Sequence, residues 1–398
     1  MSPATAAPRL RWLVLAVFVL SSAINYLDRM ALATLAPVVR AEFGLTNADY
    51  GWIVAAFSIA YALSAPFAGM LTDRIGLNRS ISVAVALWSL AGIATGFTSG
   101  LGGLIACRTL LGIAEAAGIP AAGKAIHQFL QPAERGLGNA LNQMAVSLGL
   151  VLAPPIATWI AVTHGWRMAF AATGVLGLIW IAVWNFTSRR VPIAPPPKSD
   201  PREASGILRD RRLWAFAGAN ALSMIGYSLW TNWTTVYLIE VHGLTLVQAA
   251  WYAWIPPVFA ALGGFAGGWF SMRLIRRGTP ALAARFRACL LASILALATA
   301  AIPMAPSAAW ACAGISLAIL AVAAFSVNTY TLPLDAFGGA RAAFAVSILV
   351  SSYGVAQFVI SPMIGWMMDR HAYSAIAALG AVTPLAACAL LRITRSAE

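Results

Sequence analysis

Long apolar stretches recur along the whole of this 398-residue sequence, and they constrain its fold more than any other feature. Hydrophobic residues make up 60% of the chain and charged residues only 10%, whereas about a quarter of a soluble domain is charged. A helix needs about 20 apolar residues to cross a hydrocarbon core roughly 30 Å thick. The sequence therefore predicts an all-α membrane protein with twelve spans, at residues 12–37, 49–71, 80–98, 101–123, 136–162, 168–187, 213–238, 247–271, 288–305, 308–332, 342–367 and 373–391.

The positive charge of the chain follows this predicted topology. If the segment between the sixth and seventh spans is cytoplasmic, only Arg40, Arg167 and Arg370 lie outside, and only Arg29 and Arg108 lie within spans. All the other Lys and Arg residues, of 26 in total, then fall on the cytoplasmic side, as the positive-inside rule requires. The net charge of +13 thus indicates orientation in a lipid bilayer and no nucleic-acid partner. We expect a multi-pass monomer of the cell inner membrane with both termini in the cytoplasm.

A proline-rich, charged segment at 189–212 predicts a cytoplasmic linker between two six-helix bundles, at 1–188 and 213–398. The frame G-x-x-x-D-R occurs at 69–74 and again at 365–370, on opposite faces of the predicted topology. Such a match indicates inverted three-helix repeats within the halves. The cysteines and histidines lack metal-ligand spacing, so we expect no metal and no cofactor.

Four charged residues lie at membrane depth: Asp28, Arg29, Arg108 and Glu115. Each charge at the centre of a bilayer costs about 2.5–3.5 kcal/mol, so these side chains must face a wet cavity or one another. Arginine matches a carboxylate through two parallel hydrogen bonds and stays charged at physiological pH. Arg29, with Asn25 and Tyr26 one turn below it, is therefore the first candidate to bind an anionic substrate, and Arg108 is the second.

The two acids, Asp28 and Glu115, are candidate proton carriers. A carboxyl group in an apolar cavity holds its proton more tightly, whereas a nearby arginine favours proton release, so an anion that competes for the arginine could switch protonation. The alternative is purely structural: Asp28 with Arg29, or Arg108 with Glu115, would be fixed pairs that lock helices together.

Weaker candidates lie in other spans. Four polar or aromatic side chains could contact substrate, or could equally serve helix packing and the membrane interface: Tyr61, Gln143, Trp233 and Ser351. In the loop after the second span, glycines permit a tight turn and flanking charges could bridge the cytoplasmic ends of helices from the two halves. This gating group comprises Gly69, Asp73, Arg74, Gly76 and Arg79; its alternative is a charged loop that only sets topology.

Several of these motifs together resemble a known family. GMLTDRIGLNR after the second span is similar to the signature of the major facilitator superfamily. NYLDR, YGWIVAAFSIAYAL, RTLLGIAEAAGIPAAGKAI, GWRMAF and LPLDAF resemble its anion:cation symporter family, whose members carry sugar acids such as hexuronates and galactonate. The resemblance implies that Asp28 and Glu115 couple protons and that Arg29 binds the anion. The sequence departs from the pattern at Met272, in place of an Asp, and at Thr235, in place of a Pro.

These observations favour a secondary active transporter that moves a small organic anion, such as a hexuronate or an aldonate, together with a proton by alternating access. An antiporter of drugs or metabolites with the same fold is the alternative, although two arginines at membrane depth argue against it. A sensor of the same fold that does not transport also stays open. An intramembrane enzyme is disfavoured, because the sequence has no HExxH or GxGD motif and no candidate Ser-His pair at membrane depth.

Overall fold

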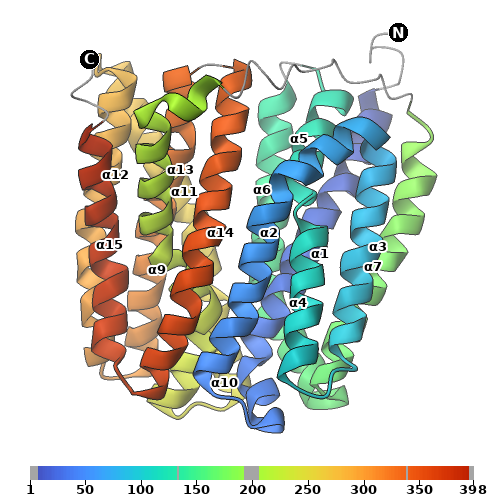
Figure 1. Cartoon of the computed structure of the whole chain (residues 1–398), viewed down its shortest axis with the longest axis vertical. Coiled ribbons are helices and arrows are strands. Elements are labelled where there is room, and N and C mark those ends of the chain that lie inside the picture. Colours follow the sequence, from blue (N-terminus) through green and yellow to red (C-terminus); the bar gives the residue numbers. More distant parts are fainter. Residues whose placement is uncertain (1–7, 132–133, 192–205, 338, 394–398) are drawn as a thin grey trace. The chain divides into compact units, whose positions relative to one another are not determined.

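A computed structural model describes residues 8–131, 134–191, 206–337 and 339–393, except for the side chains of eight of these residues: 8, 73, 339–343 and 393. The described residues form α-helices and short 3₁₀ segments and contain no β-strand. The chain divides into two compact units: Met1–Phe43 with Leu63–Lys198, here called unit 1, and Gly44–Ala62 with Ser199–Glu398, called unit 2. Within each unit the long helices run side by side, up and down (Figure 1). Most of the predicted linker, 192–205, lies outside the described residues.

Unit 1 is built from long helices that approach one another at glycines. A Cβ atom added at Gly149 would lie 2.3 Å from the carbonyl oxygen of Ala23, and one added at Gly174 would lie 2.5 Å from that of Ser89. The backbones of these helices therefore touch, which is how membrane helices associate without a hydrophobic driving force between them. The helices are α1 (Pro8–Phe43), the second half of α2 (Asn47–Ile75), α3 (Leu77–Thr95), α4 (Leu101–Glu115), α5 (Gly118–Phe129), α6 (Arg135–His164) and α7 (Trp166–Ser188).

Unit 2 uses the same kind of packing. Gly263 and Gly267, one turn apart, leave room for the backbone of a neighbouring helix at Leu320 and Ala324. The elements are the first half of α2, η3 (Gly206–Arg209), α9 (Arg211–His242), α10 (Leu246–Ala253), α11 (Ile255–Arg276), α12 (Ala281–Leu297), η4 (Ala298–Met304), α13 (Ala308–Phe337), α14 (Gly339–Asp369) and α15 (Tyr373–Ile393).

The predicted spans correspond to these helices. In the described part of the chain, eleven helical segments are long and apolar enough to cross a membrane, and α9 is the twelfth long helix but is more polar. Many helices extend beyond the predicted limits, because hydrogen bonding continues past the apolar core; α12, for example, begins at Ala281 and not at 288. Large apolar side chains such as Phe97, Phe265 and Met304 are strongly exposed, as expected of surfaces that face lipid.

One predicted span is not continuous. Residues 101–123 were expected to form one helix, but α4 ends at Glu115 and α5 begins at Gly118. Pro120 explains the break, since it has no N–H group to donate to the carbonyl of Ala116, four residues earlier. Glu115 is therefore the last residue of a half-helix, at an interruption of the span.

Candidate substrate and proton site

An ion pair between α1 and α4 forms the centre of the site in unit 1. Arg29 donates from Nε (3.0 Å) and from Nη2 (2.7 Å) to the same oxygen, Oε2, of Glu115. The Glu115 side chain is completely buried, whereas 26% of the Arg29 side chain remains exposed. The expectation of fixed pairs between Asp28 and Arg29, or between Arg108 and Glu115, does not describe this contact, because Arg29 pairs with the acid of the other helix.

The surroundings of Arg29 agree with its predicted neighbours. Its guanidinium carbon lies 4.9 Å from the centre of the Tyr26 ring, a cation–π contact. Asn25 is 7% exposed, and its Nδ2 has no hydrogen-bond partner among the described residues. Arg29 thus combines an acid on one side, an aromatic face on another and an exposed portion that a ligand can reach.

Asp28, although adjacent in sequence, faces other helices. Its Oδ1 accepts a hydrogen bond from Thr173 Oγ1 of α7 at 2.8 Å. A Cβ atom built on Gly92 of α3 would lie 3.2 Å from both carboxylate oxygens, so a larger residue there would make the acid shift by a few tenths of an ångström. Sequence reasoning missed Thr173 and Gly92; the only signal was that Thr173 follows the GWRMAF motif.

Arg108 of α4 completes the cluster. It is 4% exposed, and its guanidinium carbon lies 5.8 Å from the centre of the Phe170 ring of α7. Its charge and that of Arg29 both act on Asp28. All four predicted charges therefore lie in unit 1 and interact, and two cations balance two acids.

Of the weaker substrate candidates, one belongs to unit 1 and three belong to unit 2. Gln143 is exposed on α6, next to Asn142, whose side chain accepts a hydrogen bond from Ser22 of α1 at 2.8 Å. Three further candidates belong to unit 2 and make local contacts there. The Tyr61 ring lies 5.9 Å from that of Phe57.

The other two candidates of unit 2 contact the first half of α2. Trp233 is fully buried with its ring 4.9 Å from that of Tyr50. Ser351 donates a hydrogen bond to the Ala62 carbonyl at 3.1 Å. In this arrangement both side chains serve helix packing.

The predicted gating residues surround the junction of α2 and α3. Gly76 has φ of +86°, a left-handed conformation that favours glycine, and it makes the turn. Gly69 was expected to contribute to this turn, but it lies inside α2, so the expectation is wrong for that residue. Arg74 and Arg79 are exposed. The side chain of Asp73 lies outside the described residues.

The second G-x-x-x-D-R frame makes a contact that the sequence did not predict. Asp369, at the end of α14, accepts hydrogen bonds from the backbone N–H groups of Asn47 (2.9 Å) and Ala48 (3.0 Å), the first residues of α2. Gly365 lets the two helices approach, since a Cβ there would lie 2.2 Å from the Asn47 carbonyl oxygen. A carboxylate at a helix N-terminus satisfies free N–H groups and the helix dipole.

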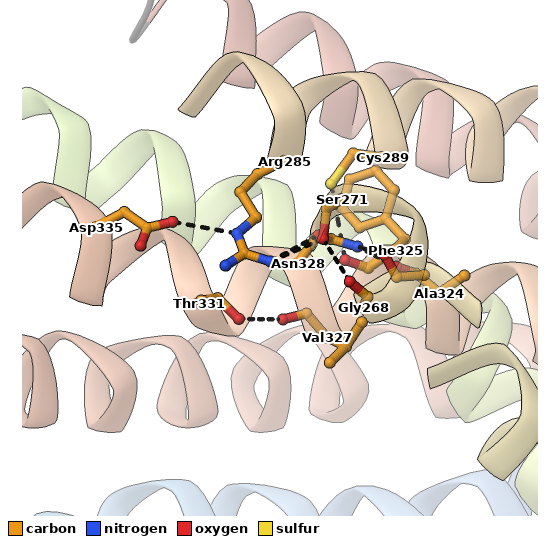
Figure 2. Close-up of polar contacts among 11 residues, drawn as sticks. Gly268, Ser271, Arg285, Cys289, Ala324, Phe325, Val327, Asn328, Thr331 and Asp335 are labelled. Atoms are coloured by element: carbon orange, nitrogen blue, oxygen red, sulfur yellow. Dashed lines mark hydrogen bonds and ion pairs between the residues drawn. The ribbon is translucent and has the colours of Figure 1, made fainter. Parts of the chain in front are cut away.

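Unit 2 has a polar cluster of its own, between α11, α12 and α13 (Figure 2). Arg285 donates to Asp335 Oδ2 (3.2 Å), to Ser271 Oγ (2.8 Å) and to Asn328 Oδ1 (3.5 Å). Asn328 in turn donates to the carbonyls of Gly267 (3.1 Å) and Ala324 (2.9 Å). We call these residues the Arg285 cluster. It ties three helices together at the end of the close α11–α13 contact.

Comparisons with known proteins agree with this fold. The Major Facilitator Superfamily model matches residues 18–348. The hexuronate transporter of Escherichia coli (strain K12) is 28% identical over 403 residues, which cover 94% of this chain and 92% of that protein. The galacturonate transporter of Dickeya chrysanthemi is 29% identical over 282 residues, covering 66% of this chain and 82% of that protein.

A solved structure is also similar in fold. It is a bacterial homologue of the human lysosomal transporter Spinster, with a TM-score of 0.75 at 22% identity, and the match covers 98% of this chain and 96% of the other. The likeness confirms the predicted all-α membrane fold. The chain is a multi-pass membrane protein that belongs to the Major Facilitator Superfamily, and it is therefore a transporter and not an enzyme.

Proposed function

We propose that this protein carries a small organic anion with a carboxylate group, of the sugar-acid class, across the cell inner membrane together with a proton. The observation that carries the proposal is the Arg29–Glu115 pair, in which a partly exposed arginine is held by a fully buried acid. The names of the hexuronate and galacturonate transporters support sugar acids as substrates.

The pair suggests how proton and anion are coupled. Glu115 Oε2 accepts hydrogen bonds from both Nε and Nη2 of Arg29, so it competes with any substrate carboxylate for these donors. A proton on Glu115 removes its negative charge and weakens its hold on Arg29, which then becomes available to the anion. Loss of the proton restores the ion pair and displaces the anion. Binding of the two ligands is therefore mutually favourable.

Asp28 is the second proton carrier in this proposal, and Arg108 is the second cation. The four groups sum to no net charge when both acids are ionised. One anion and one proton leave that sum unchanged, so the loaded cluster costs no more to bury than the empty one. We propose that the protein acts as a monomer by alternating access, with both termini in the cytoplasm and with Gly76, Arg74, Arg79 and Asp73 in the inner gate.

The test separates binding from coupling. Glu115→Gln keeps the shape of the acid but cannot exchange a proton. In proteoliposomes this variant should still exchange labelled galacturonate for unlabelled galacturonate, but it should fail to accumulate galacturonate when a pH gradient is applied. Accumulation driven by pH at the wild-type rate would contradict the coupling mechanism.

A matched control is available in the same unit. Glu134, at the start of α6, pairs with Arg11 at 3.5 Å and, in the described part of the chain, with none of the four charged residues of the site. Glu134→Gln should retain both exchange and accumulation. If the wild-type protein itself takes up neither galacturonate, glucuronate nor galactonate, the sugar-acid assignment fails, whatever the variants do.

A further inference from the structure

The hydroxyl group of Thr173 lies within hydrogen-bond distance of two acceptors. Its Oγ1 is 2.8 Å from Asp28 Oδ1 and 3.0 Å from the carbonyl oxygen of Phe170, one turn earlier in α7. A hydroxyl has one hydrogen to donate but can also accept, and it rotates to suit its neighbours. Thr173 therefore cannot donate to both acceptors at once, and the choice depends on the charge of Asp28.

Asp28 and Thr173 are both largely closed to water. Asp28 is 2% exposed and Thr173 is 5% exposed. The second carboxylate oxygen, Oδ2, has no hydrogen-bond partner among the described residues. On α3 the group that faces the acid is the glycine Gly92, which brings no polar side chain.

The charged neighbours of Asp28 lie on two helices. They are Arg29 on its own helix, and Arg108 and Glu115 on α4. Neither Gly92 nor Thr173, which face it from α3 and α7, titrates. The hydrogen bond between Thr173 and Asp28 can be kept in both charge states of the acid, because a hydroxyl can either donate or accept.

We propose that Thr173 is a positioning residue that serves both protonation states of Asp28 by exchanging the direction of their shared hydrogen bond. When Asp28 is ionised, Thr173 donates to Oδ1. When Asp28 is protonated, its O–H donates to Thr173 Oγ1, and the Thr173 hydrogen turns to the Phe170 carbonyl. The hydroxyl keeps its own hydrogen throughout, and the proton on Asp28 comes from and returns to the transport pathway. The inference rests on the proposed function in that Asp28 changes its protonation during the cycle.

The alternative for Thr173 is a packing role, in which its hydroxyl merely bonds its own helix, as threonines in membrane helices do. Thr187 on the same helix is the matched control. It is 9% exposed, and its hydroxyl bonds the carbonyls of Val183 (2.8 Å) and Trp184 (3.1 Å) without an acid nearby. Thr187→Val therefore removes a comparable hydroxyl from α7 but not the partner of Asp28.

The experiment measures the uptake of labelled galacturonate, as a function of pH, into proteoliposomes that contain Thr173→Val, Thr173→Ser or Thr187→Val. A hydrogen bond stabilises an ionised acceptor more than a neutral one, so its loss favours the protonated acid. The pH of half-maximal uptake should rise by about 0.5 to 1 unit in Thr173→Val, with a lower maximal rate. Thr173→Ser and Thr187→Val should keep the wild-type profile.

A second readout needs no substrate. In infrared difference spectra recorded on a pH change, the C=O stretch of protonated Asp28 is identified by its loss in Asp28→Asn. This band should move to higher frequency in Thr173→Val and stay in place in Thr173→Ser and Thr187→Val. If the protein transports none of the sugar acids, the infrared band still tests whether Thr173 is hydrogen-bonded to protonated Asp28.

Three results would overturn the proposal. An unchanged band and an unchanged pH profile in Thr173→Val would leave the hydroxyl with a packing role only. Equal impairment of Thr173→Ser would assign the effect to the lost methyl group. Absence of any pH-dependent Asp28 band in the wild-type protein would mean that Asp28 does not change its protonation. Size-exclusion elution checks that each variant is folded, and Thr173→Ala replaces Thr173→Val if the valine variant is not.

Discussion

The Arg29–Glu115 pair of unit 1 and the Arg285–Asp335 pair of unit 2 join the same kinds of side chain in different environments. Glu115 and Asp28 are buried and each keeps one oxygen, Oε1 or Oδ2, without a hydrogen-bond partner in the described part of the chain. Asp335 is partly exposed, with 19% of its side chain accessible. Water can reach its carboxylate, whereas it is largely excluded from the two acids of unit 1.

The arginines differ in the same way. Arg285 donates to three side chains, and 16% of its own side chain is accessible (Figure 2). Arg29 donates through Nε and Nη2 to one oxygen of Glu115, and its side chain is more exposed, at 26%. A saturated network stabilises a single arrangement, whereas buried acids with spare acceptor capacity are costly to keep and are typical of functional sites. We therefore expect substitutions in unit 1 to affect transport and those in the Arg285 cluster to affect stability.

The largest expected effect distinguishes the two arginines. Arg29→Lys keeps the positive charge but loses the planar pair of donors, so galacturonate uptake should fall by about 10- to 100-fold while the protein still folds. Arg285→Lys should leave uptake within about twofold of wild type but lower the thermal stability in detergent. Uptake and melting temperature are measured on the same preparations. Near-normal uptake by Arg29→Lys would show that Arg29 is not the carboxylate ligand.

A smaller effect is expected from one methyl group added to each cluster. In Gly267→Ala the new Cβ would lie 2.5 Å from the backbone oxygen of Ala324, so α11 and α13 must separate, at a cost of about 1–3 kcal/mol. In Gly92→Ala the Cβ would lie 3.2 Å from the Asp28 oxygens, and the acid must shift by a few tenths of an ångström.

The two glycine variants should thus differ in what they impair. Gly267→Ala should lower the melting temperature with little change in uptake per folded molecule. Gly92→Ala should keep its melting temperature but lose about 2- to 10-fold in pH-driven uptake, because the contact with Thr173 is strained. The opposite pattern, with the stability loss in Gly92→Ala, would remove the distinction between the clusters.

The sequence predicted the fold and the four charged residues because each leaves a strong local signal. Apolar length marks a span, and a charge within it marks a costly residue that needs a partner. The partners themselves were not predictable with the same ease. Consecutive residues on a helix face different directions, so Asp28 and Arg29 have different partners. Only the arrangement of α1, α4 and α7 in the fold selects Glu115 and Thr173 as those partners.

Whether a further feature could be predicted depended on whether its cause lies nearby in the sequence. Pro120 signalled the break after Glu115, although hydropathy alone runs through it. Thr173 resembles every other threonine in an apolar span, since its role comes from a neighbour 145 residues away. The contact of Asp369 with the start of α2 likewise joins residues more than 300 positions apart, and the sequence around either residue does not indicate its partner.

The smallest expected effect concerns Asp210, an acid that belongs to neither cluster. It serves as a reference for the loss of an ordinary acid–arginine contact. Asp210 accepts the backbone N–H of Arg212 and so caps the start of α9, outside the spans. Hydrogen bonds from the Arg212 side chain hold the pKa of Asp210 below its ordinary value of 3.8. Because the folded-state pKa is lowered, the stabilisation from Asp210 is present above pH 3.8 and is lost as the pH falls through the folded-state value.

Asp210→Ala removes both the cap and the charge and should destabilise the protein by about 1 kcal/mol at neutral pH. Asp210→Asn keeps a good capping residue and should stay within a few tenths of a kcal/mol of wild type there, but it should lose less stability than wild type when the pH drops below 3.8. Thermal unfolding at pH 7 and at pH 3.5 measures both. Neither variant should change galacturonate uptake at neutral pH, since a helix cap outside the spans carries no substrate or proton. A loss of uptake in the Asp210 variants as large as that of Arg29→Lys would show that transport responds to any lost acid–arginine contact. The difference between unit 1 and the Arg285 cluster would then no longer identify the substrate site.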